Sequence, residues 1–226
     1  MAAASCLLTE DQFLCSICLD VFTDPVAIPY GHNFCKACIS EHWDVNVPSQ
    51  CPNSHPALIL SDDGKQVTHG DVKKNLQKNP ERFNHCVNVL AKQSFSSGRF
   101  YYEVQVKGKT GWDLGVARES INRKGIITPS PQEGFLTIVL RNENEYKACA
   151  GPRVRLSLKS QPEKVGVFVD YEEGLVSFYD VDAAALIYSF TGYCFKEKLY
   201  PYFSPHLNYG GKNSAPLIIS PVNHTE

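Results

Sequence analysis

The sequence predicts a mostly β protein built from two modules, a small metal-bound head followed by an antiparallel β-sandwich. Six of the nine cysteines lie in the first 51 residues. After about residue 55, short apolar and aromatic runs alternate with turn residues, and no helical period is sustained. The net charge also changes sign near residue 55. Residues 1–56 hold one base and six acids, a net of −5, whereas the rest holds 21 bases and 18 acids, a net of +3.

The composition excludes several classes of protein. At 43% hydrophobic and 20% charged residues, the chain is ordinary for a globular protein. No apolar run reaches the roughly 18 to 20 residues of a membrane span, and no signal peptide is evident, so we expect no membrane partner and a cytoplasmic location. Disulfides are then unexpected, and the cysteines are metal ligands or buried thiols. Lysine and arginine form no stripe, so we expect no nucleic-acid partner.

The head contains a dense array of metal-ligand residues. Cys15-x2-Cys18 is followed by His32-x2-Cys35-x2-Cys38 and then by Cys51. Two pairs of the C-x2-C type can present four thiolates to one tetrahedral zinc, and so small a segment needs the metal to fold. A set of ordinary buried thiols is the alternative, but chance pairs at this spacing are rare.

The segment "FLCSICLDVFTDPVAIPYGHNFCKACISEHWDVNVPSQCPN" resembles a RING finger of the tripartite-motif (TRIM) family. The resemblance implies a first zinc site made by Cys15, Cys18, Cys35 and Cys38. For the second site it leaves only His32 and Cys51, because Tyr30 and Ser54 stand where the family has cysteine. His55, one residue further on, could serve as a third ligand. A hydroxyl is a poor zinc ligand beside thiolate, so we predict one firm zinc site and one doubtful site.

The same resemblance implies a groove that holds a ubiquitin-conjugating enzyme and orients its ubiquitin thioester, with no covalent intermediate and no catalytic residue of the chain's own. The groove residues carried over are Ile17, Trp43 and Pro52, although Ile17 and Trp43 could instead fill the small core. Because the second zinc site supports the Pro52 side, we expect weak or absent ligase activity. Robust autoubiquitination that is lost in Ile17→Ala would contradict this expectation.

The second module is predicted to consist of short strands. Runs such as "FYYEVQV" (100–106), "VGVFVDY" (165–171) and "LVSFYDV" (175–181) are separated by glycine-containing turns, which is typical of an antiparallel β-sandwich. We expect most aromatic residues to be core. The inward strand positions are assigned to Phe100, Tyr102, Phe135, Phe168, Phe178 and Phe190.

This part closely resembles the PRY-SPRY domain of TRIM proteins and butyrophilins. The motifs are "HPALILSDDGKQV", "GRFYYEVQV", "GWDLGVARESINRKG", "VGVFVDYEEGLVSFYDV" and "GGKNSAPLIISP". The resemblance implies a module that binds a target protein through loops at one end of the sandwich, and no nucleophile–base pair suggests an enzyme. The candidate loops are Asn75–His85, Ile126–Glu133, Asn142–Pro152 and His206–Lys212.

Three residues are predicted to contact the target. Antibody-binding members of the family use a tryptophan-rich pocket, and alignment on Trp112-Asp113 puts its tryptophans at Val139 and Arg141 and a phenylalanine at Leu207. Only Asp113 is kept, so a different ligand is expected, again a protein. Asp113, Arg141 and Leu207 are the candidates, although Arg141 and Leu207 could simply be exposed positions.

The predicted organisation is an N-terminal extension (1–12), a RING-type finger with a degraded second site (13–54) and a PRY-SPRY domain (55–224). The B-box and coiled coil that the family places between these parts have no counterpart here, so we expect a monomer. Two functions stay open. One is a TRIM-like ubiquitin ligase, a class often tied to innate immunity; the other is a non-catalytic binding protein that competes with longer relatives.

Overall fold

The computed structural model of the chain describes residues 25–28, 32–35, 53–76 and 79–221. These residues form fifteen strands. No helix long and apolar enough to cross a membrane occurs among them. In the head, β1 (Pro25–Ile28) pairs antiparallel with β2 (His32–Cys35), which places Cys35 opposite Pro25. The other predicted ligands and groove residues lie outside the described residues, namely Cys15, Ile17, Cys18, Cys38, Trp43, Cys51 and Pro52.

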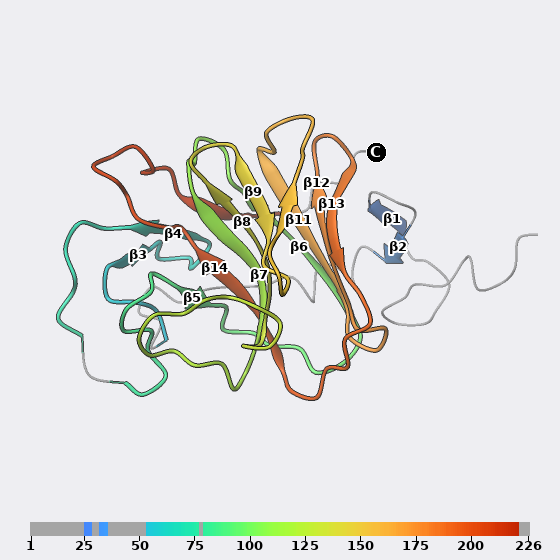
Figure 1. The fold of residues 1–226 in the computed structure, drawn as a ribbon, viewed down its shortest axis with the longest axis horizontal. Coiled ribbons are helices and arrows are strands. Elements are labelled where there is room, and N and C mark those ends of the chain that lie inside the picture. Colours follow the sequence, from blue (N-terminus) through green and yellow to red (C-terminus); the bar gives the residue numbers. More distant parts are fainter. Residues whose placement is uncertain (1–24, 29–31, 36–52, 77–78, 222–226) are drawn as a thin grey trace, which may run out of the picture.

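The remaining strands form two antiparallel sheets that face each other, as Figure 1 shows. The six-stranded sheet has the order β10 (Val154–Leu156), β9 (Glu145–Ala148), β8 (Phe135–Arg141), β7 (Trp112–Arg118), β14 (Leu199–Ser204) and β5 (Val89–Leu90). The seven-stranded sheet has the order β13 (Ala185–Phe190), β12 (Leu175–Asp180), β11 (Lys164–Asp170), β6 (Arg99–Gln105), β15 (Leu217–Ser220), β4 (Gln66–His69) and β3 (Leu58–Leu60). The predicted sandwich is confirmed.

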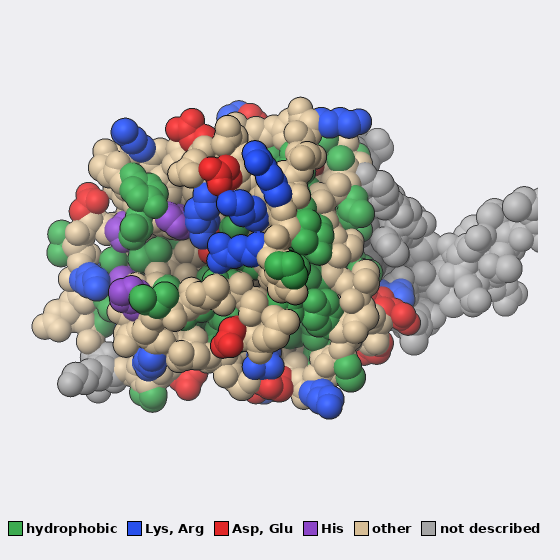
Figure 2. Space-filling view, in the orientation of Figure 1, with side chains coloured by type: hydrophobic (Ala, Val, Ile, Leu, Met, Phe, Trp, Pro, Cys, Tyr) green, Lys and Arg blue, Asp and Glu red, His purple; other side chains and the backbone are tan. Residues whose placement is uncertain are grey.

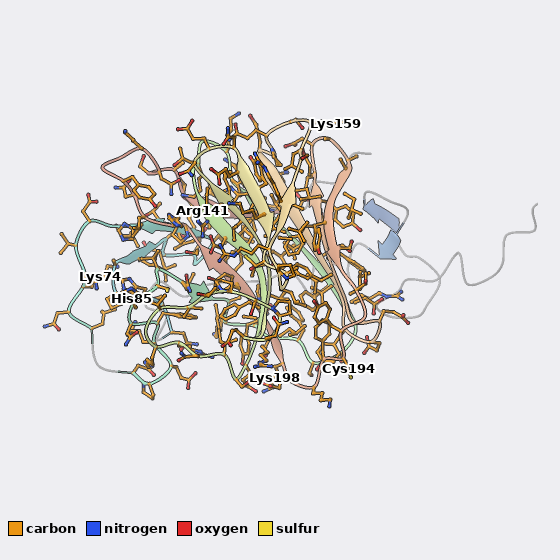
Figure 3. The ribbon with its side chains drawn as sticks, viewed as in Figure 1. Lys74, His85, Arg141, Lys159, Cys194 and Lys198 are labelled. Carbon is orange, nitrogen blue, oxygen red and sulfur yellow. The ribbon has the colours of Figure 1, made fainter. Side chains whose placement is uncertain are left out.

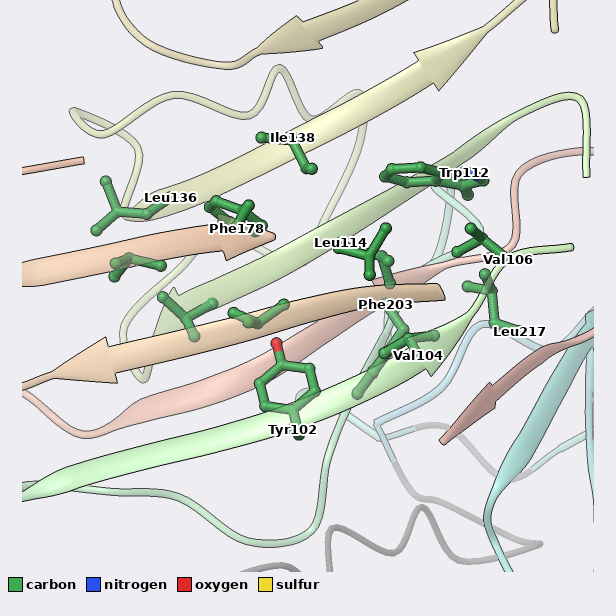
Figure 4. Packing of buried hydrophobic residues seen from close by; sticks show 14 of the residues in the cluster. Tyr102, Val104, Val106, Trp112, Leu114, Leu136, Ile138, Phe178, Phe203 and Leu217 are labelled. Carbon is green, nitrogen blue, oxygen red and sulfur yellow. The ribbon is translucent and has the colours of Figure 1, made fainter. Parts of the chain in front are cut away.

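Side chains that alternate along the strands fill the space between the sheets. Leu114 of β7, Val104 of β6 and Phe203 of β14 meet in this core (Figure 4). Tyr102 enters it with its hydroxyl, which donates a hydrogen bond of 2.6 Å to the carbonyl of Gly115. Gly115 has a φ of 149°, and a Cβ there would lie 2.1 Å from a backbone oxygen of β8, so only glycine fits this crossing.

The six aromatic residues predicted for the core are all buried, but two of them face away from it. Phe135 belongs to a second apolar cluster, and Phe168 alternates with the inward-facing Val167 and Val169 of β11. For these two residues the prediction of an inward position is therefore wrong. A continuously apolar strand is buried on both faces, and periodicity cannot then tell which face is which.

The second cluster covers part of the outer face of the six-stranded sheet. Its members are Phe83, Leu90, Ala117, Ile121, Phe135 and Tyr202, with Ile127 packed against them. The segments that carry Phe83 and Ile127 are loops, so this cluster holds two long connections against the sheet. The loops thereby form one wall of the hollow described next.

Candidate functional site

A hollow of about 250 Å³ opens on the outer face of the six-stranded sheet, where β7 begins. Its lining includes His85, Asp113, Ile127, Arg141, Arg153 and Leu207. The residues come from four loops and from three strands, so they are far apart in sequence. Figure 3 labels Arg141 and His85 on this face, away from Cys194 and Lys198. A rigid sheet therefore supports the hollow and loops surround it, which is the usual arrangement of a binding site.

The strand register places Asp113 and Arg141 together. Asp113 lies opposite Val139 on β8, so Arg141, two residues further along, is its diagonal neighbour on the outer face. Nη1 of Arg141 donates to Oδ1 of Asp113 over 2.5 Å and also to the carbonyls of Trp112 and Leu140, at 3.1 and 2.7 Å. The Asp113 side chain is only 7% exposed, whereas the Arg141 side chain is 31% exposed. The ion pair thus forms the floor of the hollow, where its two charges balance and the Arg141 side chain is partly exposed.

Asn213 holds the loop that carries Leu207. Its side-chain amide donates to the carbonyls of Gly111, Pro205 and Leu207 at 2.9 to 3.0 Å. Its Oδ1 accepts from the amides of Thr110 and Gly111 at 2.9 and 3.3 Å. Asn213 is 2% exposed, so these bonds form away from water. One side chain therefore joins the loop to the segment that leads into β7.

The same loop contains backbone conformations that L-residues seldom adopt. His206 and Tyr209 have φ values of 59° and 51°. Such residues persist only where their surroundings fix them, which the bonds of Asn213 do here. Burial, and then the charge of Arg141, lower the pKa of His206, so its imidazole is neutral at pH 7. Leu207, 44% exposed, is presented at the rim.

Lys109 lies beneath this loop. It is 1% exposed, and its ammonium donates to the carbonyls of Ala215 and Asn213 at 2.9 and 3.4 Å. No carboxylate pairs with it among the residues that the structure describes. Burial lowers the pKa of Lys109 to about 8. A buried cation therefore reinforces the loop through backbone carbonyls alone.

The structure brings the three predicted target-binding residues to one hollow, since Asp113, Arg141 and Leu207 all line it. Three of the four predicted loops also contribute lining residues. The fourth, Asn142–Pro152, is not wholly a loop, because residues 145–148 form β9. The sequence reading missed Arg153 and Asn213. Asn213 carries no sequence signal, because its importance comes from groups that lie about 100 residues away.

The zinc chemistry of the head can be tested against its donor set. Four thiolates, from Cys15, Cys18, Cys35 and Cys38, are the ligands that a closed structural zinc site requires, so the first site fits the metal. When bound, zinc would supply folding free energy to this segment. In the described residues alone, no group of three or more His, Cys, Asp or Glu could hold a metal.

The residues at the end of the predicted second zinc site lie in the sandwich. Ser54 and His55 are 4% and 1% exposed within the sandwich. The Ser54 carbonyl accepts from Arg82 at 2.8 Å, and the His55 amide donates to the Asn88 carbonyl at 3.2 Å. Nδ1 of His55 accepts from the Ala57 amide at 3.2 Å. These residues are part of the sandwich, but the buried Nε2 of His55 has no hydrogen-bond partner among the described residues, so a third zinc ligand at His55 stays a prediction.

Comparisons with known protein families agree with this architecture. The SPRY domain matches residues 99–218, the SPRY-associated domain matches residues 54–95, and the RING-type zinc-finger matches residues 15–52. The chain belongs to the SPRY family. A RING-type finger followed by both SPRY parts also agrees with the predicted TRIM relationship.

Individual relatives support the same assignment. The chain is 50% identical to "Nuclear factor 7, brain" of Xenopus laevis over 179 residues, which is 76% of this chain and 29% of that protein. It is 47% identical to human "Pyrin", over 79% of this chain and 23% of that protein. It is 45% identical to mouse "E3 ubiquitin-protein ligase TRIM21", over 73% of this chain and 35% of that protein. The chain thus matches about a quarter to a third of the length of these relatives.

Among solved structures, the PSpry domain of TRIM65 superposes with a TM-score of 0.64. The alignment covers 80% of this chain and 94% of that domain at 22% identity. At this identity the likeness establishes the sandwich fold alone.

Proposed function

We propose that this protein binds a target protein through the hollow on the outer face of the six-stranded sheet. The observation that carries the proposal is the convergence of Asp113, Arg141 and Leu207 on one hollow. It combines a few placed polar groups with apolar walls, which is the composition of a recognition site. Loops supported by a sheet can vary in sequence without loss of the fold.

The test compares two leucines of similar exposure. Leu207 is 44% exposed at the hollow, and Leu186 is 50% exposed on β13 of the other sheet. A partner captured by the full chain should bind Leu207→Ala at least about tenfold more weakly, because an apolar anchor is lost, and should bind Leu186→Ala normally. Equal binding by both variants would show that the partner uses another surface.

The RING-type head extends this proposal. We infer that the head recruits a ubiquitin-conjugating enzyme to the bound target. The RING-type match supports this inference, as do the predicted groove residues Ile17, Trp43 and Pro52. The chain would then act as a TRIM-type ubiquitin ligase by orientation. The test is an autoubiquitination assay with purified components and a panel of conjugating enzymes. Weak activity of the full chain that Ile17→Ala abolishes is the expected result for a working head with one firm zinc site.

A second candidate is a non-catalytic binding protein. It is favoured by Ser54, which stands where the RING pattern has a cysteine ligand and is buried in the sandwich. Native mass spectrometry separates the two candidates. Two zinc ions per chain would support the ligase, and one zinc ion together with no autoubiquitination would support a protein that occupies the target without modifying it.

A further inference from the structure

The cationic residues around the hollow follow the strand register of the six-stranded sheet. Asp113 of β7 lies opposite Val139, Val139 lies opposite Lys147, and Lys147 lies opposite Arg155 of β10. Directly opposed residues share one face of a sheet, so this row runs across the outer face. Figure 2 shows a gathering of Lys and Arg side chains near the middle of this face, in the region where Figure 3 labels Arg141.

The acids nearby are already engaged. The Asp113 carboxylate is buried and bonded to Arg141, and the Glu145 carboxylate accepts from Lys147 at 2.9 Å. Arg153 and Arg155 are both exposed. Neither forms an ion pair or a side-chain hydrogen bond within the part of the chain that the structure describes. Two guanidinium groups thus remain available at and beside the hollow.

The shape of the site favours a peptide over a nucleic acid. The hollow is about 250 Å³, room for a few side chains, and Ile127, Pro129 and Leu207 give it apolar walls. A nucleic acid would need an extended run of phosphate contacts, which two free arginines do not provide. A guanidinium has a planar fork of donors that matches a carboxylate, so these arginines suit Asp or Glu side chains.

We propose that the hollow binds an acidic segment of the partner protein, with an apolar side chain inserted beside Leu207 and carboxylates on Arg153 and Arg155. This inference rests on the proposed function and specifies the chemistry of the ligand. Arg153 is the principal contact because it lines the hollow itself, whereas Arg155 lies beside it on β10.

The experiment selects ligands without assuming their identity. A phage-displayed library of random peptides is panned on the immobilised full chain, and the consensus peptide is made with a fluorescent label. A second version replaces each Asp and Glu by Asn and Gln. Both are titrated with the wild-type chain, with Arg153→Glu and with the control Lys159→Glu. Lys159 is an equally exposed cation that Figure 3 places at the edge of the molecule, away from Arg141.

The expected result is a consensus rich in Asp and Glu. The amide version and Arg153→Glu should each weaken binding about tenfold, whereas Lys159→Glu should change it less than about twofold. Binding should also weaken about tenfold as NaCl rises from about 50 to about 300 mM, because exposed charges are screened. Arg153 and Lys159 are both exposed, so the variants should retain the wild-type thermal transition.

Three outcomes would overturn the inference. The first is a neutral consensus whose binding is lost in Leu207→Ala; the proposed function would then stand and only the acidic chemistry would be wrong. The second is equal weakening by Arg153→Glu and Lys159→Glu, which would indicate general attraction. The third is displacement of the peptide by an oligonucleotide of equal charge, which would indicate a polyanion surface. A consensus peptide insensitive to both Leu207→Ala and Arg153→Glu would instead contradict the proposed function itself.

Discussion

Nη1 of Arg141 lies 2.5 Å from Oδ1 of Asp113, and the two residues are diagonal neighbours on β8 and β7. The carboxylate is almost fully buried, so the guanidinium is what makes its charge tolerable in that position. The ion pair joins the floor of the hollow to the strand ends that define it. It therefore connects the stability of the sheet with the shape of the proposed binding site.

Breaking this pair from one side should cost more than removing both partners. Arg141→Met leaves the Asp113 carboxylate buried without its partner, and we expect the free energy of unfolding to fall by about 3 to 5 kcal/mol. The double variant Arg141→Met/Asp113→Asn should lose less, because no charge is left buried. Urea unfolding of the full chain gives both values. A double variant that loses as much stability as Arg141→Met would show that the pair is not energetically coupled.

Asn213 should control the loop that presents Leu207. Asn213→Ala removes the two N–H donors that three carbonyls share and the oxygen that accepts from two amides, and we expect a loss of about 3 kcal/mol because several buried backbone groups are left unpaired. Hydrogen exchange should accelerate in residues 205–213 before it does in β8. Asn213→Asp retains the acceptor oxygen but sets a second oxygen against the three carbonyls, so it should also destabilise the loop.

His55 should make the sandwich sensitive to acid. Burial, and then the nearby Lys73, lower the pKa of His55 to about 4 from the usual 6.5. The unfolded chain then binds more protons between these values, so the free energy of unfolding falls as the pH drops from 6.5 towards 4, by about 2 kcal/mol from this group. Well above pH 6.5 the histidine is neutral in both states and contributes no slope.

His55→Asn is the matched variant for this effect. Its Oδ1 can accept from the Ala57 amide as Nδ1 does, but it does not titrate. The difference in stability between the wild type and this variant should therefore change between pH 6.5 and 4 and stay constant from pH 7 to 8. His206 is present in both chains and cancels in the comparison. A difference that is independent of pH would contradict the assignment.

Lys109 should make the free energy of unfolding depend on pH under alkaline conditions. Its folded pKa of about 8 is below the usual 10.5, so the unfolded chain binds more protons in between. The free energy of unfolding therefore rises with pH above 8, because the folded chain releases the Lys109 proton before the unfolded chain does. Below pH 8 the ammonium is charged in both states, and the whole cost of burying it destabilises the fold. Lys109→Met should abolish this rise. Chemical denaturation is best compared between pH 8 and 9.5, because the buried Tyr102 and Tyr202, whose pKa is raised, titrate in the unfolded chain only near 10.

The sequence by itself determined the broad organisation. The two C-x2-C pairs predicted a zinc-binding head, which resembles a RING finger, and alternating strands with glycine turns predicted the sandwich, because both signals are local in the chain. The alignment on Trp112-Asp113 also selected Arg141 and Leu207 as candidates. These predictions do not depend on which residues lie close together in the folded chain.

The tertiary structure alone decided which of these residues meet. Whether Phe135 and Phe168 face the core depends on what covers the second face of each sheet, and sequence periodicity does not contain that information. Asn213 acts on backbone groups about 100 residues away, and Arg153 reaches the hollow only because β10 pairs with β9. That Nδ1 of His55 accepts a backbone hydrogen bond inside the sandwich is likewise visible only in the folded chain. Contacts of this kind depend on three-dimensional packing, which local residue order does not specify.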